Sequence, residues 1–493
     1  MKTTYLIDTA VSYPKSPPFH PAVCFPEIKM QISPTLGDNG IYRIIRDLFI
    51  TAGFDQGAFN TPDWNPLGTL IKPGNHVVLK PNWVYDFPEG ENHGLHLTTQ
   101  GSFIRVVLDY VIIALKGSGQ VTICDGPIQS ASFNRILDEH GIPAILSVYD
   151  KLSEIKIQTI DLRYEEVTAT DNKIVARRKV KGDPLGHTEI DRGASSYLEE
   201  FSNDRKIRFS ALGYGEAETN RHHSKGIHRY LIANTVLDAD VFINLPKMKT
   251  HKRTGITGAL KNLVGINGSK AYLVHSHRHK ITGGDEFERY TLKARFAHVM
   301  DFTLKPYIPV WIWSRIWAFW KWYKKRLSKS AKQGNYGTEL LSFGGGWWGN
   351  QTLWRTIYDI NTILFYSDKS GTITEKPQRR YLAIVDGIIG CEGEGPLRGD
   401  PRPEGIVIIG EDPISVDACM ADLMGFNCRK IPIIGKYKNI DPKKSFTTYD
   451  GNQESACVGK QGHIKPFVPP LLWKNHIEKN NLSMAKEREA ECP

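Results

Sequence analysis

The sequence lacks the cysteine patterns of most metal and redox proteins. Its seven cysteines are scattered, with no Cys-x-x-C pair and no Cys/His cluster at the spacing of zinc or iron–sulfur ligands. An export signal is lacking as well, because Asp8, Ser12 and Pro14 interrupt the apolar residues near the N-terminus. We therefore expect a cytoplasmic protein whose cysteines are reduced.

Carboxylates are absent from two segments that are rich in lysine and arginine. From Lys247 to Lys280 there are eight Lys/Arg and no Asp/Glu, and from Lys305 to Lys332 there are again eight and none. Removing these sixteen charges from the formal net charge of +10 leaves the rest of the chain at −6. A slightly acidic body with two basic segments is unlike a nucleic-acid coat protein, so we expect no specific nucleic-acid partner.

What is present is the composition of a folded protein and a repeated order of strand and helix. The 493 residues are 40% apolar and 24% charged, which is enough for a large core. Short apolar runs that end in polar residues alternate with helical patterns, for instance over 76–83, 101–117 and 120–127. This order predicts a two-lobed α/β fold with a parallel or mixed sheet, flanking helices and a site at the C-terminal strand ends.

Composition divides the chain into five regions. They are an N-terminal extension (1–75), an α/β region (76–275) with a polar insertion at about 163–228, a basic Trp-rich insertion (276–342), a second part of the α/β region (343–435) and a C-terminal tail (436–493). The two α/β parts are predicted to form one cleft between them.

The first basic segment contains a loop that suits an anion. In "NLPKMKTHKRTGITGALKNLVGING" (244–268), glycines let backbone N–H groups approach a ligand, lysines neutralise it, and a predicted helix starts near Gly258. The pattern predicts binding of a phosphate or carboxylate group; a solvated basic loop is the alternative. The residues expected to bind the ligand are Lys80, Asn82, Lys247, Lys249, Thr254, Gly255, Thr257, Gly258 and Asn262.

Acidic residues follow two later strands and are expected to face the basic loop. Asp386, Glu392 and Glu394 come at or after "YLAIVDG", and Asp412 comes after "GIVIIG". Such carboxylates can act as general acids or bases, or bind a divalent cation. The alternative for Asp412 is a helix cap, and the glycines of 387–399 would then only turn the chain.

Five blocks, in order, resemble the DUF362 family of bacterial and archaeal proteins. They are "VVLKPNW", "NLPKMKTHKRTGITGALKNLVG", "WWGNQTLWRTIYDIN", "DGIIGCEGEGPLRGDP" and "GEDPISVDACMADLMG", within about residues 76–430. That family has no established biochemical function, and many members add a ferredoxin-like Cys-rich domain, which this chain lacks. The resemblance therefore implies the family without a reaction.

A more distant resemblance concerns "HKRTGITGALK" (251–261). It is similar to the H-x-x-x-G-[FY]-S-G-G-x-K signature of the nickel-pincer lactate racemase family. The resemblance implies that His251 belongs to a metal site and that Lys261 carries a covalently attached pincer nucleotide. Ala259 stands where the signature has its second paired glycine, and "CDGPIQ" replaces the family's Gly-x-His motif after the second strand.

These residues support an enzyme and two alternatives. In the enzyme, Lys261 is a nucleophile, Schiff-base former or cofactor anchor, His251 is an acid/base or metal ligand, and Asp386 and Glu394 are catalytic. The candidate metal ligands are His251, Asp386 and Glu392, and the expected cofactor is a divalent metal or a nucleotide-type group. The first alternative is a non-catalytic protein that binds an anionic ligand or a membrane surface. The second is racemase- or isomerase-like chemistry with the lysine-anchored metal–pincer cofactor.

Residues 307–327 combine tryptophan with a basic end. Five of the eleven tryptophans lie within 311–322, and Lys324, Lys325 and Arg326 follow. The apolar part is shorter than the roughly 20 residues that span a bilayer, but tryptophan and basic side chains favour the headgroup region. We expect an interfacial helix on an anionic inner membrane surface. The alternatives are a buried helix and an interface between identical subunits.

Overall fold

The computed structural model describes most of the chain. The described residues are 2–28, 35–87, 94–150, 155–171, 173–211, 213–305, 307–332, 340–441, 443, 445–450, 457–459 and 464–479.

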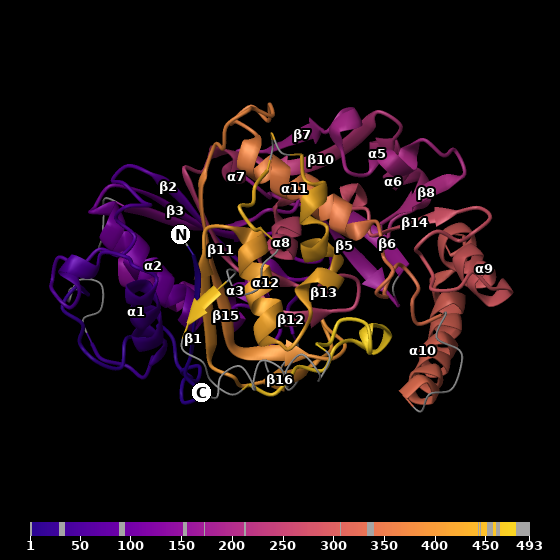
Figure 1. Ribbon diagram of the computed structural model, residues 1–493. Helices are drawn as coiled ribbons and strands as arrows, with labels where there is room; N and C mark the ends of the chain where they lie inside the picture. The colour runs from indigo at the N-terminus through magenta and orange to yellow at the C-terminus, as the bar shows by residue number, and fades with distance from the viewer. Residues whose placement is uncertain are drawn as a thin grey trace.

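One mixed sheet of eleven strands forms the centre of the molecule (Figure 1). Its parallel part consists, in spatial order, of β4 (Ile155–Asp161), β3 (Gly119–Asp125), β2 (His76–Pro81), β11 (Val241–Leu245) and β15 (Arg380–Glu392). Strands β2 and β11 and the middle of β15 are almost fully buried, as expected for parallel strands covered on both faces, whereas the edge strand β4 is only partly buried. The predicted α/β fold with a mixed sheet and flanking helices is confirmed.

The sheet continues beyond β15 with strands from both ends of the chain. The antiparallel strand β17 (Ile406–Gly410) pairs with β15, and β1 (Thr3–Ile7) lies between β17 and β18 (Cys457–Gly459). The second half of β15 also pairs with β12 (Lys247–His251) and β16 (Asp400–Arg402), and β12 turns back into β13 (Gly255–Ile256). The basic loop is thereby fixed against the central sheet.

Helices cover the two faces of the sheet, and side chains alternate between them. Val77 and Leu79 of β2 lie in the core that contains α1 (Ile41–Thr51) and α2 (Gly101–Leu115). Val78 points to the opposite core. The helices of that second core are α8 (Gly258–Asn262), α11 (Leu353–Tyr366), α12 (Pro413–Leu423) and α13 (Pro432–Gly435). Lys80, two residues after Val78, therefore points toward the α8 side.

Smaller elements surround this framework. Helices α3 (Phe133–Glu139) and α4 (Ile142–Tyr149) follow β3, and α7 (Asn234–Asp238) precedes β11. The predicted polar insertion contains the hairpin β5–β6 (Glu165–Thr170, Lys173–Lys179), β7 (His187–Asp191), α5 (Glu199–Ser202), β8 (Ile207–Ser210), α6 (Glu216–His222) and β9 (His223–Ser224). Strand β7 pairs with β10 (Ile227–Ala233), and β8 pairs with β14 (Ser276–His279).

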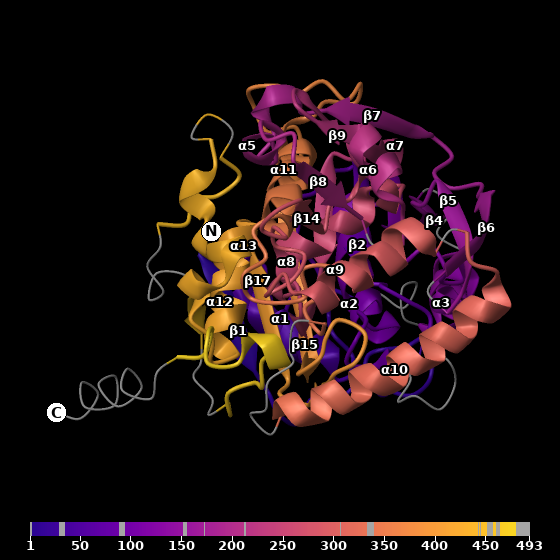
Figure 2. The same ribbon diagram turned by 90° about the vertical axis from the view of Figure 1, so that its right-hand side faces the viewer.

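The Trp-rich segment forms a long helix at the edge of the molecule. It consists of α9 (Leu292–His298), the π-helical turn η6 (Val299–Leu304) and α10 (Val310–Lys332). Figure 2 shows α10 running along one side, outside the central sheet. Over the described ranges, none of the helices combines the length and apolar character needed to cross a membrane.

Candidate functional site

The carboxyl ends of β2 and β3 bring a buried ion pair to the edge of the sheet. Nζ of Lys80 lies 2.6 Å from Oδ1 of Asp125 and 3.1 Å from Oδ1 of Asn262. Asp125 also accepts a hydrogen bond from the N–H of Trp83 through its Oδ2 atom (2.7 Å). A side chain at Gly265 would place its Cβ 2.1 Å from Oδ1 of Asp125, so only glycine lets the backbone cover this pair.

A chain of asparagines holds α8 against the strand ends. Nδ2 of Asn82 donates to Oδ1 of Asn262, and Nδ2 of Asn262 donates to Oδ1 of Asn244, each at 2.7 Å. Asn244 in turn donates to the carbonyl of Ala259 at 2.8 Å. The predicted ligand-binding residues Asn82 and Asn262 thus form part of a rigid support for the loop.

Side chains alternate along β12, which separates its apolar residue from its cations. Met248 lies in the hydrophobic core, whereas Lys247 and Lys249 project from the other side of the strand. Nζ of Lys247 lies 3.1 Å from Oδ2 of Asp386, and both side chains are fully buried. The hydroxyl of Tyr13 donates to Asp386 and accepts from Lys247. The predicted basic and acidic groups therefore do meet here, but as a closed, neutralised pair.

Four other cations lie close together without such neutralisation. We call Lys249, Arg253, Lys261 and Lys270 the cationic cluster. Burial, together with the charges of Lys270, Lys249, Arg253 and Lys80, lowers the pKa of Lys261 to about 7. Burial likewise lowers the pKa of Lys249 to about 7 and that of Lys270 to about 8. Burial is the largest cause of each pKa shift, and the neighbouring positive charges add to it.

Three members of the cationic cluster are held by backbone carbonyls. Lys249 Nζ donates to the carbonyl of Leu97 (2.6 Å), Lys270 Nζ to that of Gly126 (2.9 Å), and Arg253 Nε to that of Gly344 (2.9 Å). Within the described ranges, none of the four forms an ion pair. Lys261, which is only partly buried, also has no hydrogen bond there.

Two neutral histidines adjoin the cationic cluster. Nδ1 of His251 accepts the N–H of Arg253 (3.1 Å), which leaves the proton on Nε2. Nδ1 of His275 donates to the carbonyl of Leu273 (2.8 Å), which leaves Nε2 as the acceptor. Burial lowers both pKa values well below the ordinary range, and the charges of Lys261 and Arg253 act in the same direction. The two rings thus offer one donor and one acceptor.

The start of α8 already receives a carboxylate of the protein. Asp417 on α12 accepts hydrogen bonds from the N–H groups of Ala259 and Leu260, the latter at 3.1 Å. Gly258 has φ = +58°, and a Cβ there would lie 2.1 Å from Oδ1 of Asp417. Burial raises the pKa of Asp417 to about 8. The helix start that was expected to favour a ligand anion is therefore occupied from within.

The remaining loop residues have mixed surroundings. Thr254 donates through its hydroxyl to the carbonyl of Ile256 (2.8 Å), and Gly255, the first residue of β13, has φ = +80°. In contrast, two of the predicted ligand-binding residues each have a buried atom without a hydrogen-bond partner among the described residues: Oγ1 of Thr257 and Oδ1 of Asn82. Unpartnered buried polar atoms are uncommon, and a bound ligand can supply what they lack.

The acidic loop after β15 does not reach the cationic cluster. Glu392 pairs with Arg402 (2.6 Å) and accepts from the N–H of Val468, while Glu394 is exposed and accepts from the N–H of Leu471. The structure thus separates the proposed metal ligands His251, Asp386 and Glu392. Over the residues that the structure describes, no three His, Cys, Asp or Glu side chains converge as a metal site requires.

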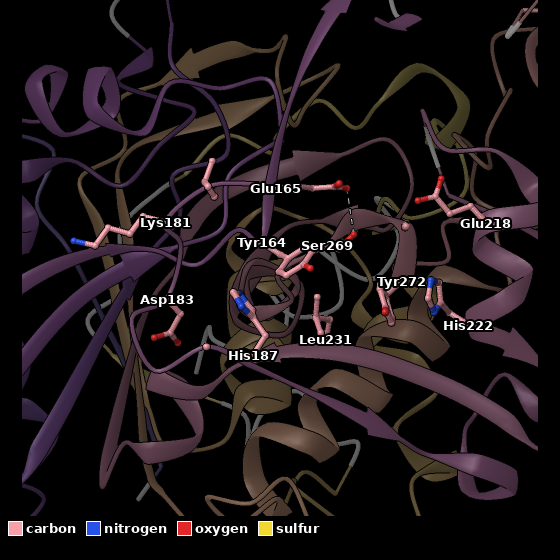
Figure 3. Close-up of a pocket in the computed structure, with 13 residues that line it drawn as sticks. Tyr164, Glu165, Lys181, Asp183, His187, Glu218, His222, Leu231, Ser269 and Tyr272 are labelled. Atoms are coloured by element: carbon pink, nitrogen blue, oxygen red, sulfur yellow. Dashed lines mark hydrogen bonds between the residues drawn. The ribbon is translucent and has the colours of Figure 1, made fainter. Parts of the chain in front are cut away.

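A separate cavity of about 480 Å³ lies on the other side of the segment 269–272 (Figure 3). Ser269, Ala271 and Tyr272 line it, whereas Lys270 between them donates to Gly126 on the cluster side. Its other lining residues are Tyr164, Glu165, Val180, Lys181, Asp183, Gly186, His187, Glu218, His222 and Leu231. Figure 3 shows Glu165 hydrogen-bonded to Ser269. None of the residues predicted for the site is among those that line this cavity.

The family model described as "Domain of unknown function (DUF362)" matches residues 166–422. The chain belongs to the DUF362 family. A thylakoid-associated protein of Synechocystis sp. is 21% identical over 407 residues, which cover 82% of this chain and 81% of that relative. The matched DUF362 region includes the whole cationic cluster and Asp417, whereas Lys80 and Asp125 precede it.

The DUF362 chain meets only part of the pattern implied by the racemase resemblance. His251 and Lys261 are neighbours, since the charge of Lys261 lowers the pKa of His251. The strand end where that family has its Gly-x-His motif carries Asp125, and this carboxylate is committed to Lys80. The residues present therefore lack the histidine that the pincer chemistry requires, and we derive no step through such a cofactor.

Sequence reasoning missed Lys270 and His275. Both lie in the same carboxylate-free run as the basic loop, from Lys247 to Lys280. Following that run to its end would have added both residues to the predicted site. In the structure, the charge of Lys270 acts on Lys261, and the charge of Lys261 acts on His275.

Proposed function

We propose that the cationic cluster binds the phosphate or carboxylate group of a small molecule. The observation that carries the proposal is Lys261: its ammonium group lies among Lys249, Arg253 and Lys270 and has no partner within the described residues. Holding like charges close together is costly unless an anion offsets them. A bound phosphate or carboxylate would do so through charge-assisted hydrogen bonds.

The surroundings favour an enzyme over a passive binder. Amines with pKa values near 7, such as those of Lys249 and Lys261, can both accept and release a proton at physiological pH. His251 and His275 add a neutral donor and a neutral acceptor. These groups suit proton transfer next to an anionic substituent, as in isomerase-like or transferase-like reactions. Asp386 and Glu394 have no part in this proposal, because they are engaged elsewhere.

The test is thermal stabilisation by inorganic phosphate and by malonate. An anion at one hundred times its Kd should stabilise the native protein by about 2.7 kcal/mol. We expect Lys261→Gln and Lys249→Gln to lose most of this stabilisation. Lys206→Gln is the matched control, because Lys206 is exposed and its side chain forms no hydrogen bond or ion pair with the described residues. Equal stabilisation of all four proteins, or of none, would overturn the proposal.

A second candidate function is work at a membrane surface. The relative from Synechocystis is named for its association with thylakoids, which are membranes. On α10 of this chain, Trp311 and Trp322 are 63% and 49% exposed. Exposed tryptophan beside basic residues is typical of helices that lie in the headgroup region. In this case the protein would be cytoplasmic and peripheral on the inner membrane face.

A further inference from the structure

One face of α10 is apolar and exposed to solvent. Trp311, Phe319 and Trp322 follow one another at helical spacing and are 63%, 58% and 49% exposed. Arg315 and Arg326 stand beside them, with guanidinium groups 5.6 Å and 4.4 Å from the rings of Trp311 and Trp322. This face thus combines aromatic rings with cations and covers no other part of the described chain.

The other tryptophans of α10 point inward. Trp313 is buried and donates from Nε1 to the carbonyl of Asp171 (2.9 Å). Trp317 and Trp320 line a small apolar cavity together with Met300 and Phe343. Attachment of α10 to the body therefore uses one set of tryptophans and leaves a second set free.

The preceding helices also carry exposed apolar side chains. Leu292 and Phe296 of α9 are 82% and 58% exposed, and Val299 and Leu304 of η6 are each 43% exposed. Figure 2 shows α9 beside α10 on the same side of the molecule. An exposed apolar surface of this extent, rimmed by charge, marks an interaction site.

We infer that this face, which we call the outer face (residues 292–326), docks the protein on a bilayer with anionic headgroups. The inference rests on the second candidate function above and names its contact surface and its lipid chemistry. Arg315, Lys325 and Arg326 are exposed, and the chain from Lys305 to Lys332 has no Asp or Glu, so the surface complements negative charge. Each basic residue near an anionic leaflet contributes about 1 kcal/mol.

A bilayer fits this face better than a protein partner does. The 23 residues of α10 make a rod of roughly 35 Å, which can lie flat with its rings at headgroup depth. Protein interfaces are depleted of lysine, yet Lys325 is exposed and is followed directly by Arg326, whose guanidinium lies over the ring of Trp322. On a bilayer, the ammonium group of a lysine can stay among the lipid phosphates and needs no specific protein side chain as a partner.

The test is co-sedimentation of the full chain with vesicles. One set is phosphatidylcholine alone, and the other contains phosphatidylcholine and phosphatidylglycerol in equal parts, each at low and high salt. We expect at least tenfold stronger binding to the anionic vesicles, weakened by salt because exposed charges are screened. The variant Trp311→Ser/Trp322→Ser should lose at least tenfold in binding, and Lys325→Gln/Arg326→Gln should lose the preference for anionic lipid.

Trp348→Ser is the matched control, because Trp348 is 42% exposed on a different segment. It should bind vesicles like the wild type. If wild type binds but the Trp311/Trp322 variant binds equally well, the membrane function stands and the outer face is the wrong surface. Equal binding to neutral and anionic vesicles would overturn the lipid chemistry. No binding, or a change in oligomeric state caused by the Trp311/Trp322 variant, would overturn membrane docking and favour a contact between copies of the chain.

Discussion

Nζ of Lys80 lies 2.6 Å from the carboxylate of Asp125, and this buried ion pair stands directly beside the cationic cluster. The charge of Asp125 acts on both Lys270 and Lys249, but its oxygens are committed to Lys80 and to the N–H of Trp83. The cluster therefore keeps an excess of positive charge.

Anion affinity should depend on pH. Because the pKa of Lys261 is lowered to about 7, its amine loses the proton as the pH rises through neutrality. We expect the Kd for sulfate, whose own charge is constant, to increase at least tenfold from pH 6 to pH 9. Calorimetry should also show proton uptake on binding at pH 7.5, since a bound anion raises the lysine pKa. A Kd that stays constant over this range would contradict the role of Lys261.

The free energy of unfolding of the ligand-free protein should increase with pH, whereas the anion affinity decreases. A lysine whose folded pKa is near 7 and whose unfolded pKa is about 10.4 makes the unfolded state bind more protons between those values. The contribution of Lys261 to the free energy of unfolding should therefore rise from pH 7 to pH 10. Lys261→Gln should flatten this rise in urea titrations, whereas Lys206→Gln should leave it unchanged.

Removing one partner of the buried Lys80–Asp125 ion pair should lower the free energy of unfolding. Asp125→Asn keeps the shape but leaves the ammonium of Lys80 uncompensated, and such changes cost about 3–5 kcal/mol. Urea denaturation of the variant checks the value. Lys80→Met/Asp125→Leu should recover much of the loss because no buried charge remains. A single variant as stable as wild type would show that Lys80 is not charged in the folded protein.

Asp417 should be needed for the shape of the basic loop. Asp417→Ala leaves the N–H groups of Ala259 and Leu260 without acceptors. Each N–H group that stays buried should then lower the free energy of unfolding by about 1–3 kcal/mol. Asp417→Asn keeps one acceptor and should cost less. Hydrogen exchange of the two amides gives a local readout: it should accelerate in the alanine variant, and unchanged protection would contradict the assigned contact.

Protein from its native host should contain an unmodified Lys261. The reason is that Asp125, paired with Lys80, stands where the racemase family has its histidine motif. Intact-mass measurement checks this expectation. A nucleotide-scale adduct that disappears in Lys261→Arg would contradict it and revive the pincer chemistry.

The strands and the convergence of their polar ends could be predicted from the sequence, because both depend on local patterns. "HVVLKPNW" and "QVTICDGP" each show an apolar run that ends in polar residues, and parallel strands bring such ends together. The cap formed by Asp412 was one of two alternatives, and its carboxylate does accept the N–H groups of Ile414 and Ser415. The hydrogen bonds that join Asn82, Asn262 and Asn244 also lie where the strand ends converge. The sequence alone does not show which of these side chains bond to one another.

Contacts between distant segments could not be predicted. Tyr13 meets Asp386 across 373 positions of the chain, and Asp417 meets α8 across 158. Nothing local marks these pairs, since each depends on how β1 and α12 join the sheet. For the same reason the sequence could not tell that Lys247 would be neutralised and Lys261 left unpaired.

The two sets of tryptophans illustrate the same limit. Trp311 and Trp313 are two residues apart, yet the first is 63% and the second 2% exposed. The helical period alone separates them into two faces, but only the packing of α10 against Asp171 and Phe343 decides which face is free.

The most direct test of the anion site is anomalous diffraction from crystals that contain selenate. The account predicts an anomalous peak at the cationic cluster, with a selenate oxygen within about 3 Å of Nζ of Lys261. It also predicts that the peak disappears in crystals of Lys261→Gln grown under the same conditions. Selenate bound only elsewhere, with Lys261 surrounded by water, would contradict the central claim.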